Sequence, residues 1–208
     1  SASAQVNVVA PTLPTATLAA TTDYCVTATK GATLVVTATG TGALTYSLNG
    51  APAQTSNTFT NVGAGTHTIT VTDSNNCPVT INGIVIAPEL KAAASITKTL
   101  DCTTPNATIK VDISGGKTPY TYTVAKGTGT PGGVINVTGT SFTISVASAN
   151  ADKYTFAITD ANGCFTTQSV TIGTTPDVTA PVPNVAVLPE ITNYCSVLAS
   201  EIAIPTAT

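Results

Sequence analysis

One phrase occurs twice in the chain, as TVTDSNNC at residues 70–77 and as AITDANGC at residues 157–164. Each copy consists of a strand-like segment, a Thr-Asp step, a turn that contains asparagine, and a cysteine. Other matching pairs of positions are Cys25 and Cys102, Tyr46 and Tyr122, and Phe59 and Phe142. The sequence therefore predicts an internal repeat, and such a chain folds as an array of similar units.

Three segments that resemble strands stop at proline, which cannot donate a hydrogen bond to a sheet ladder. They are VNVVAP ending at Pro11, GIVIAP ending at Pro88 and SVTIGTTP ending at Pro176. We expect residues 1–11 to be the last strand of a preceding module, 12–88 and 89–176 to be two complete modules, and 177–208 to start a third. The spacing of matching residues grows through the middle of the second module, which indicates an insertion at residues 126–139.

Apolar and polar residues alternate along short segments rich in Thr, Val and Ile, a pattern typical of half-buried strands. The expected strands are 32–39, 44–48, 57–62 and 67–73 in the first module, 106–114, 120–124, 141–146 and 154–160 in the second, and a closing strand in each. The expected core faces are those of His67, Ile69 and Val71, and of Tyr154, Phe156 and Ile158. The sequence predicts an all-β chain of tandem Ig-like antiparallel β-sandwich modules.

Low charge excludes some classes of partner. Only 8% of residues are charged, the net charge is −3 and Lys plus Arg total 7, so no basic surface is available for a nucleic-acid backbone. No apolar run approaches the roughly 18 residues of a membrane span, so we expect no direct membrane insertion. The first residues, SASAQVNVVAP, lack the features of a signal peptide, and we expect any export signal or anchor to lie outside this segment.

The five cysteines occupy matched positions of the repeat. We predict one disulfide inside each module, Cys25–Cys77 and Cys102–Cys164, with Cys195 paired to a cysteine outside the segment. Such bonds indicate an oxidising, extracellular location. The alternative is that these residues are buried free thiols. A zinc site would need closely spaced Cys or His, and the chain has no CxxC, so we expect neither a metal nor another cofactor.

Three stretches, GGKTPYTYTV (115–124), GAGTHTITVTDSNNC (63–77) and YTFAITDANGC (154–164), resemble the SprB-type repeat of large surface adhesins in gliding Bacteroidota. Residues 178–208 resemble the start of a HYR-like, Ig-fold module. The sequence departs from the family pattern in its insertion and at Asn76, where the family usually has glycine.

The resemblance implies a long cell-surface protein, attached to the outer membrane, whose tandem modules form a stalk or filament. It also implies export by the type IX system, a role in adhesion or gliding motility, and contact with the secretion and motility machinery. The family motif contains no catalytic residues, so the resemblance implies a protein that is not an enzyme.

Candidate sites have alternative explanations in structure. His67, the only histidine, matches Tyr154 and is expected to pack against the core rather than catalyse a reaction. DSNN and DANG offer oxygen ligands for calcium, but the EF-hand pattern fails and Asn-containing turns explain them. GGKT at 115–118 resembles a phosphate-binding loop, yet a strand follows it where such a loop needs a helix.

Two surface features are open to more than one interpretation. Thr66, Thr68, Thr70 and Thr72 would share one outer face, which is either a site for ice or a glycan or a neutral solvent face. Asn106 and Asn136 fit the eukaryotic N-glycan sequon, which would be incidental in the bacterial protein that the resemblance implies.

We therefore expect a non-enzymatic structural or adhesive segment whose partners are neighbouring modules and a surface polysaccharide or other adhesion substrate. One alternative is a carbohydrate-binding or accessory module of a secreted polysaccharide-degrading enzyme, which would need exposed aromatic residues as stacking platforms. Another is a self-assembling extracellular fibre subunit, in which strands of neighbouring copies complete each fold.

Overall fold

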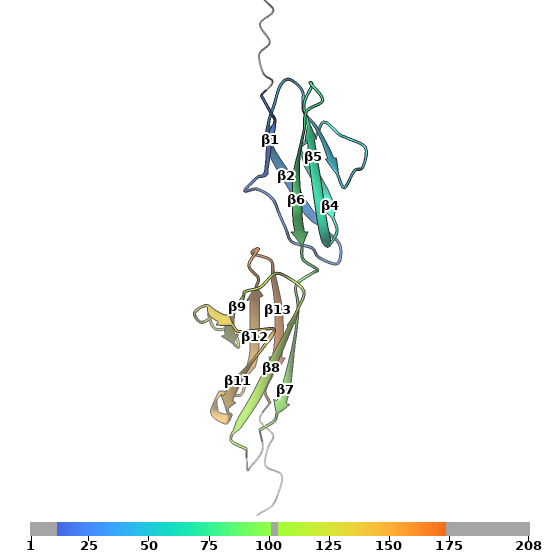
Figure 1. Cartoon of the computed structure of the whole chain (residues 1–208). Helices are drawn as coiled ribbons and strands as arrows, with labels where there is room; N and C mark the ends of the chain where they lie inside the picture. The colour runs from blue at the N-terminus through green and yellow to red at the C-terminus, as the bar shows by residue number, and fades with distance from the viewer. Residues whose placement is uncertain (1–11, 101–103, 174–208) are drawn as a thin grey trace, which may run out of the picture.

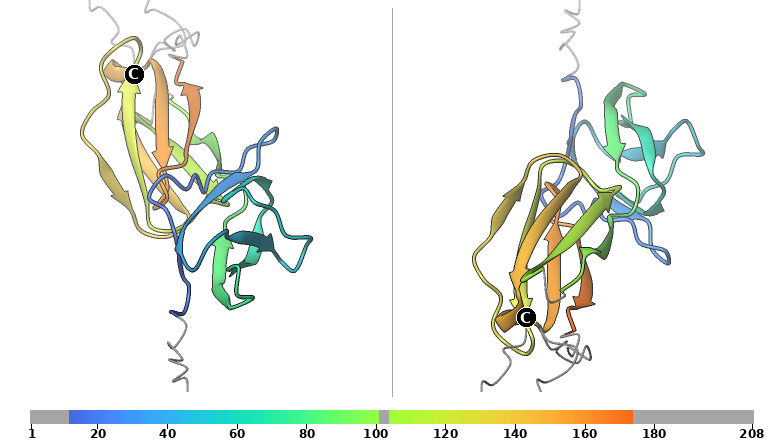
Figure 2. Two further views of the ribbon diagram at one scale, coloured as in Figure 1. Left: turned by 90° about the horizontal axis from the view of Figure 1, so that it is seen from above. Right: turned by 90° about the horizontal axis from the view of Figure 1, so that it is seen from below.

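The computed structural model describes residues 12–100 and 104–173 of the chain. The described strands fall into two groups that share neither a sheet nor a hydrophobic cluster, and we call them the first lobe and the second lobe. Figure 1 shows the lobes end to end, and the views from above and below show two separate bodies that overlap only in part (Figure 2).

The first lobe contains six strands in two antiparallel sheets. The strands are β1 (Thr15–Leu18), β2 (Ala32–Thr39), β3 (Thr45–Leu48), β4 (Thr58–Val62), β5 (Gly65–Thr72) and β6 (Pro78–Ile86). One sheet has the order β1-β2-β4 and the other the order β3-β5-β6. Both sheets contribute to one hydrophobic cluster, so the lobe is built as two layers around a shared core.

The second lobe repeats this arrangement with one additional strand. The strands are β7 (Lys91–Lys98), β8 (Asn106–Ser114), β9 (Tyr120–Lys126), β10 (Ile135–Val137), β11 (Ser141–Ala147), β12 (Lys153–Thr159) and β13 (Phe165–Thr171). The sheets have the orders β11-β8-β7 and β10-β9-β12-β13. The additional strand β10 lies inside the predicted insertion at 126–139 and pairs with β9. A 3₁₀ helix, Ser148–Asn150, is the one helical element among the described residues.

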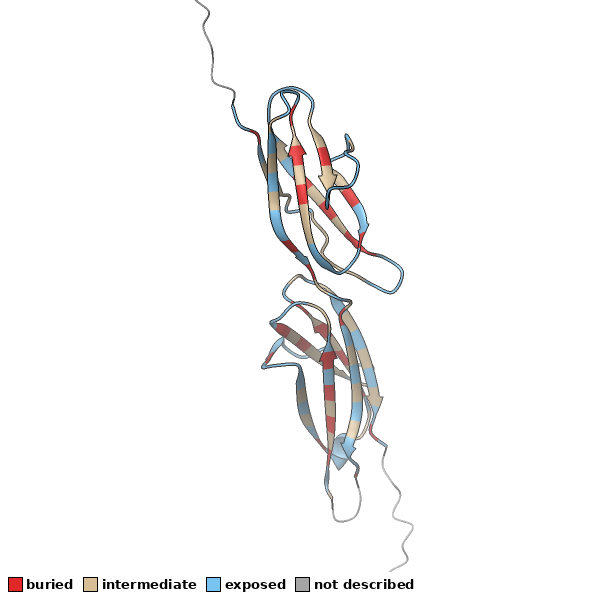
Figure 3. Ribbon diagram, turned by 45° about the vertical axis from the view of Figure 1, so that its right-hand side comes forward, coloured by how far each residue is buried: buried red, intermediate tan, exposed pale blue. Residues whose placement is uncertain are grey.

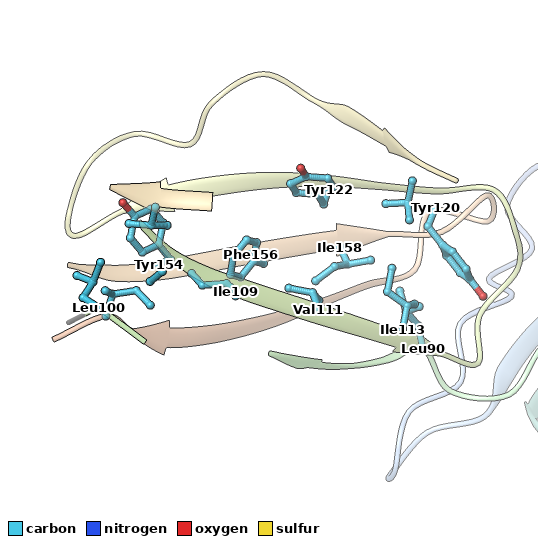
Figure 4. Packing of buried hydrophobic residues seen from close by; sticks show 14 residues of the cluster. Leu90, Leu100, Ile109, Val111, Ile113, Tyr120, Tyr122, Tyr154, Phe156 and Ile158 are labelled. Atoms are coloured by element: carbon cyan, nitrogen blue, oxygen red, sulfur yellow. The ribbon is translucent and has the colours of Figure 1, made fainter. Parts of the chain in front are cut away.

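Alternation along the strands places the core as the sequence predicts. Ile69 and Val71 are fully buried, and so are Phe156 and Ile158, whereas the residues between them are half-buried. Figure 3 shows buried segments alternating with less buried ones along strands of both lobes. In the second lobe Phe156, Ile109 and Val111 meet between the sheets (Figure 4). The rings of Tyr122 and Phe142 stack with their centroids 3.9 Å apart, and Phe156 lies edge-on to Phe142.

The prediction of an all-β chain with antiparallel sheets is confirmed. Two strands, β1 and β7, were not predicted, because TATL is short and KAAASITK consists largely of alanine and polar residues. Burial of alternate residues supplies little free energy there, and both strands form because they pair along β2 and β8. The predictions for residues 1–11 and 177–208, and for Cys102 and Cys195, lie outside the described residues.

Candidate functional site

The most distinctive chemical feature of the described chain is a disulfide between the two lobes. Cys25 of the first lobe is bonded to Cys164 of the second, across 139 residues of sequence, with the Cα atoms 5.3 Å apart. Cys25 lies in the segment between β1 and β2, and Cys164 lies in the turn that joins β12 to β13. The bond therefore ties one end of the first lobe to the facing end of the second.

This bond corrects both predicted pairings inside modules. Cys25 does not pair with Cys77, and Cys164 does not pair with Cys102, because Cys25 and Cys164 pair with each other. Cys77 is a free thiol that is half-buried. The prediction that Cys25 and Cys164 form disulfides was right in kind and wrong in connectivity.

The physical reason is that Cys25 and Cys77 lie at opposite ends of the first lobe. Asp23, which precedes Cys25, pairs with Thr33 at the start of β2. The carboxylate of Asp73, which precedes Cys77, accepts a hydrogen bond from the Thr41 amide beyond the end of β2. A strand rises about 3.3 Å per residue, so the two ends lie roughly 25 Å apart. A disulfide needs Cα atoms within about 7 Å.

A buried carboxylate positions Cys164. Asp160 is 6% exposed, and its Oδ1 accepts hydrogen bonds from the backbone amides of Asn162 (2.8 Å) and Cys164 (2.9 Å). Its Oδ2 accepts a third hydrogen bond from the Lys117 amide at 2.8 Å. Three backbone donors therefore fix both the turn and the loop beside it, which leaves the cysteine at a defined position at the end of the lobe.

A second carboxylate positions Cys25. The Oδ1 of Asp23 accepts a hydrogen bond from the Cys25 amide at 2.9 Å, and its Oδ2 accepts one from the Lys30 ammonium at 2.6 Å. The pKa of Asp23 lies below its ordinary value of 3.8, mainly because of the hydrogen bond from Lys30 and to a smaller extent because of the one from the Cys25 amide. Burial of the carboxyl group acts in the opposite direction. Sequence reasoning missed this role, although an aspartate side chain commonly accepts a hydrogen bond from the backbone amide two residues on.

Glu89 makes a further contact across the junction. Its Oε1 accepts a hydrogen bond of 3.0 Å from the Ala28 amide of the first lobe, and its Oε2 lies 3.0 Å from the Lys91 ammonium. The connection from the end of β6 to the start of β7 comprises only residues 87–90. The lobes are therefore joined at three points, namely this short connection, the Glu89–Ala28 hydrogen bond and the disulfide.

An open hollow of about 1030 Å³ lies at the junction. It is lined mainly by apolar residues of the first lobe, such as Leu18, Tyr24 and Ile84, and by Lys117 and Thr118 of the second lobe. A smaller hollow of about 380 Å³ surrounds the disulfide itself. Two acidic residues, Asp23 and Glu89, line the smaller hollow. The carboxylate of Asp23 accepts hydrogen bonds from the Cys25 amide and Lys30. That of Glu89 accepts one from the Ala28 amide and pairs with Lys91.

His67 is held by structural hydrogen bonds. Its Nδ1 lies 2.9 Å from Asn49 Nδ2, and its Nε2 lies 2.9 Å from the carbonyl oxygen of Gly63. An amide nitrogen donates and a carbonyl oxygen accepts, so the ring accepts at Nδ1 and donates at Nε2. These hydrogen bonds link His67 of β5 to the residue that follows β3 and to the connection before β5. Neither partner of the histidine is a nucleophile.

The Asp-containing turns and the GGKT segment make hydrogen bonds and close contacts within the fold. The oxygens of Asp73 and Asp160 face backbone amides, and the described residues include no group of three or more metal-ligating side chains. Gly115 has φ of +67° in a loop before β9, and a Cβ atom there would collide with the carbonyl oxygen of Glu89. Gly116 donates to the Pro88 carbonyl oxygen at 2.8 Å, so this loop seats the second lobe on the connection.

The threonine face of β5 is only partly a continuous surface. Thr70 and Thr72 are half-buried and lie opposite Ser47 and Thr45 of β3, whereas the pairing with β6 is interrupted between His67 and Ile69. The hydroxyls of Thr70 and Thr80 lie 3.5 Å apart. Whether this face binds ice or a glycan stays a prediction.

No helix among residues 12–100 and 104–173 is long and apolar enough to cross a membrane. Comparison of the whole chain with models of protein families and with curated proteins found no match.

Proposed function

We propose that the chain is a non-enzymatic structural segment of an exported, cell-surface adhesin or filament. In this proposal each lobe is an Ig-like β-sandwich module of the SprB-type repeat, and modules follow one another end to end outside the cell. The segment would hold an adhesive region away from the surface or take part in gliding motility. Its immediate partners are the neighbouring modules of the same chain.

The Cys25–Cys164 bond is the observation that supports this proposal most directly. A disulfide inside one module protects that module alone, whereas a bond between modules also resists their separation and rotation. Together with the Glu89–Ala28 hydrogen bond and the connection at residues 87–90, it limits bending at the junction. A spacer that transmits tension needs such a joint, and an extracellular compartment provides the oxidising conditions.

The carbohydrate-binding alternative has less support. Sugar-binding platforms expose aromatic rings, but Tyr46, Tyr120, Tyr122 and Tyr154 are buried in the two clusters. Tyr24 is half-buried against the junction hollow, and Phe165 is 75% exposed at the end of the second lobe. The fibre-subunit alternative would use the same lobes in a shorter polypeptide.

The test is to isolate the protein from its source and measure the intact mass and cellular location of the polypeptide. We expect a mass far above 20.7 kDa, sequence on both sides of this segment that repeats the same pattern, and release of its peptides when intact cells are treated with protease. A polypeptide of about this mass without further modules would contradict the array. Resistance to protease on whole cells, with cleavage only after lysis, would contradict the surface location.

A further inference from the structure

The turn that carries Cys77 in the first lobe has the same construction as the turn that carries Cys164 in the second. Asp73 Oδ1 accepts from the amides of Asn75 (2.9 Å) and Cys77 (3.0 Å), as Asp160 Oδ1 does from Asn162 and Cys164. The Asp73 amide donates to the Cys77 carbonyl oxygen at 3.2 Å, and the Asp160 amide to that of Cys164 at 2.9 Å. The two cysteines therefore occupy equivalent positions.

The loop beside each turn is also equivalent. Thr41 donates to Asp73 Oδ2 at 3.2 Å, and Lys117 donates to Asp160 Oδ2 at 2.8 Å. Ser74 and Ala161 donate their amides to the carbonyl oxygens of Thr41 and Lys117, respectively. Each lobe thus ends in one loop and one turn that a buried aspartate holds together. We call this end of the first lobe the distal pole, defined by residues 40–42 and 73–77.

The second lobe shows what an end of this construction binds. Its turn is covalently bonded to Cys25, and the segment that holds Cys25 belongs to the opposite end of the preceding lobe. At the distal pole, residues 40–42 and 74–76 are exposed and Cys77 is a free thiol. Among the described residues, the turn of the second lobe is therefore bonded to a neighbouring lobe, whereas the equivalent turn of the first lobe is not.

An exposed leucine, Leu13, lies next to the distal pole, since the neighbouring residue Pro14 packs beside Gly40. Thr15 begins β1 opposite Thr39, and Lys91 begins β7 opposite Ser114, so Leu13 corresponds to Glu89 in the second lobe. Glu89 contacts the preceding lobe through Ala28, whereas Leu13 is 78% exposed. A neighbour seated on the distal pole would cover this side chain and remove apolar surface from water.

We propose that Cys77 forms a disulfide with the cysteine at the Cys25 position of a further module of this kind, seated on the distal pole. This inference rests on the proposed function, because it needs a module ahead of the first lobe. It goes beyond that function by making the array covalently continuous through side chains as well as through the backbone. Tension would then be carried at each junction by two covalent paths.

The bond forms by thiol–disulfide exchange with a dithiol–disulfide oxidoreductase or another small disulfide. The Cys77 thiolate attacks one sulfur of that oxidant, which forms a mixed disulfide and releases one thiol. The partner cysteine then attacks Cys77 Sγ as a thiolate and displaces the second thiol. Two protein thiols are oxidised to one disulfide, and the oxidant leaves as two thiols with the two protons.

Disulfide mapping of the protein isolated from its source tests the proposal directly. We expect the Cys77 peptide to be linked to a peptide from a preceding module in which a cysteine follows the equivalent of β1, and to resist alkylation without reduction. If preceding modules exist but Cys77 is alkylated or linked elsewhere, this inference fails while the proposed function stands. If no module precedes the first lobe, this inference fails, and if no further module follows the second lobe either, the proposed function fails as well.

A lengthened chain provides an internal control. Residues 1–88 are placed ahead of residues 13–208, so that Leu13 takes the place of Glu89, the chain is refolded with oxidised glutathione, and a Thr80→Ser mark identifies the internal copy. We expect a bond from Cys25 of the leading copy to Cys77 of the internal copy, whereas Cys77 of the leading copy stays open to alkylation. Cys77→Ser in the internal copy should expose Cys25 of the leading copy to alkylation.

Formation of the Cys25–Cys164 bond in the same molecule shows that the lengthened chain has folded. If that bond forms and both copies of Cys77 are alkylated at the same rate, the proposal is wrong. The same conclusion follows if Cys77 of the internal copy bonds to any cysteine other than the one at the Cys25 position of the leading copy.

Discussion

Asp160 Oδ1 accepts a hydrogen bond of 2.9 Å from the Cys164 amide, so a buried carboxylate sets the position of the cysteine that joins the two lobes. The same carboxylate accepts hydrogen bonds from the backbone amides of Asn162 and Lys117. These bonds hold the β12–β13 turn and the GGKT loop together at the end of the second lobe. The junction therefore depends on a residue that makes no covalent contact itself.

Asp160→Ala should destabilise the second lobe by about 3 kcal/mol or more, because it leaves three backbone amides without their charged acceptor. We also expect slower formation of the Cys25–Cys164 bond on refolding. Urea unfolding and timed alkylation measure these effects. The control is Asp112→Ala, which removes an exposed ion pair with Lys110 and should change stability by less than about 1 kcal/mol. Equal effects of the two substitutions would contradict the assigned role of Asp160.

The double substitution Cys25→Ser and Cys164→Ser should destabilise both lobes. Glu89 and Cys164 line the same hollow at the junction, so the bond closes a loop of 89 − 25 = 64 residues when the first lobe unfolds and the second stays folded. Glu89 also contacts Ala28 of the first lobe, so the bond closes a loop of 164 − 89 = 75 residues when only the second lobe unfolds. The chain-entropy relation gives about 4 kcal/mol for either loop.

Hydrogen exchange followed strand by strand measures this loss separately in each lobe. Cys77→Ser is the matched control, because Cys77 is half-buried and its sulfur makes a weak hydrogen bond of 4.0 Å to the Asn75 carbonyl oxygen, and the loss of stability should stay within about 0.5 kcal/mol. Faster exchange in one lobe alone would show that the bond does not act as a shared constraint.

Acid should weaken the first lobe through Asp23 and Asp73. The Cys77 amide, followed by those of Thr41 and Asn75, lowers the pKa of Asp73 against the effect of burial, and Lys30 with the Cys25 amide lowers that of Asp23. A carboxylate with a folded pKa below its unfolded value stabilises the fold above the unfolded pKa, and this stabilisation is lost as pH falls through the folded pKa.

We therefore expect the free energy of unfolding of the first lobe to fall as the pH drops below about 4. Carboxyl NMR titration should place both midpoints below 3.8. Lys30→Met should move the Asp23 midpoint upward and leave that of Asp73 unchanged. A midpoint of Asp23 that does not respond to this substitution would contradict the assigned cause.

Gly115→Ala should disturb the junction and destabilise the second lobe by about 2 kcal/mol or more. The residue has φ of +67°, and a Cβ atom would collide with the Glu89 carbonyl oxygen, so backbone must move. Gly133→Ala is the control, because a Cβ atom there meets nothing within 4 Å. Thermal unfolding with and without reducing agent measures both effects. A stable Gly115→Ala protein with an intact disulfide would exclude the close approach.

The strands and the core were largely predictable because one physical rule acts along each strand. Ile69, Val71, Phe156 and Ile158 alternate with polar residues, and burying one face of a strand selects that pattern directly. The short strand β1 was not predictable in this way, since its side chains are only half-buried or exposed and its pairing with β2 is what holds it.

The sequence pointed to the cysteines of the site but not to the bonds that join them to other parts of the chain. The repeat matches Cys77 to Cys164 and Cys25 to Cys102, and the Asp-Asn turns are the segments that hold Cys77 and Cys164. The roles of Glu89 and Lys30 were missed, because each depends on a partner from another element whose position the local pattern does not encode.

The sequence by itself determined that the chain consists of strands, that it repeats, and which faces of β5 and β12 are buried, because alternation and turn chemistry are local properties. Only the tertiary structure decided which cysteines meet. The pairing of β1 along β2 places Cys25 at one end of the first lobe while Cys77 lies at the other. A disulfide joins sulfur atoms that are close in space, and that distance depends on strand direction and lobe packing, which the repeated phrase does not specify.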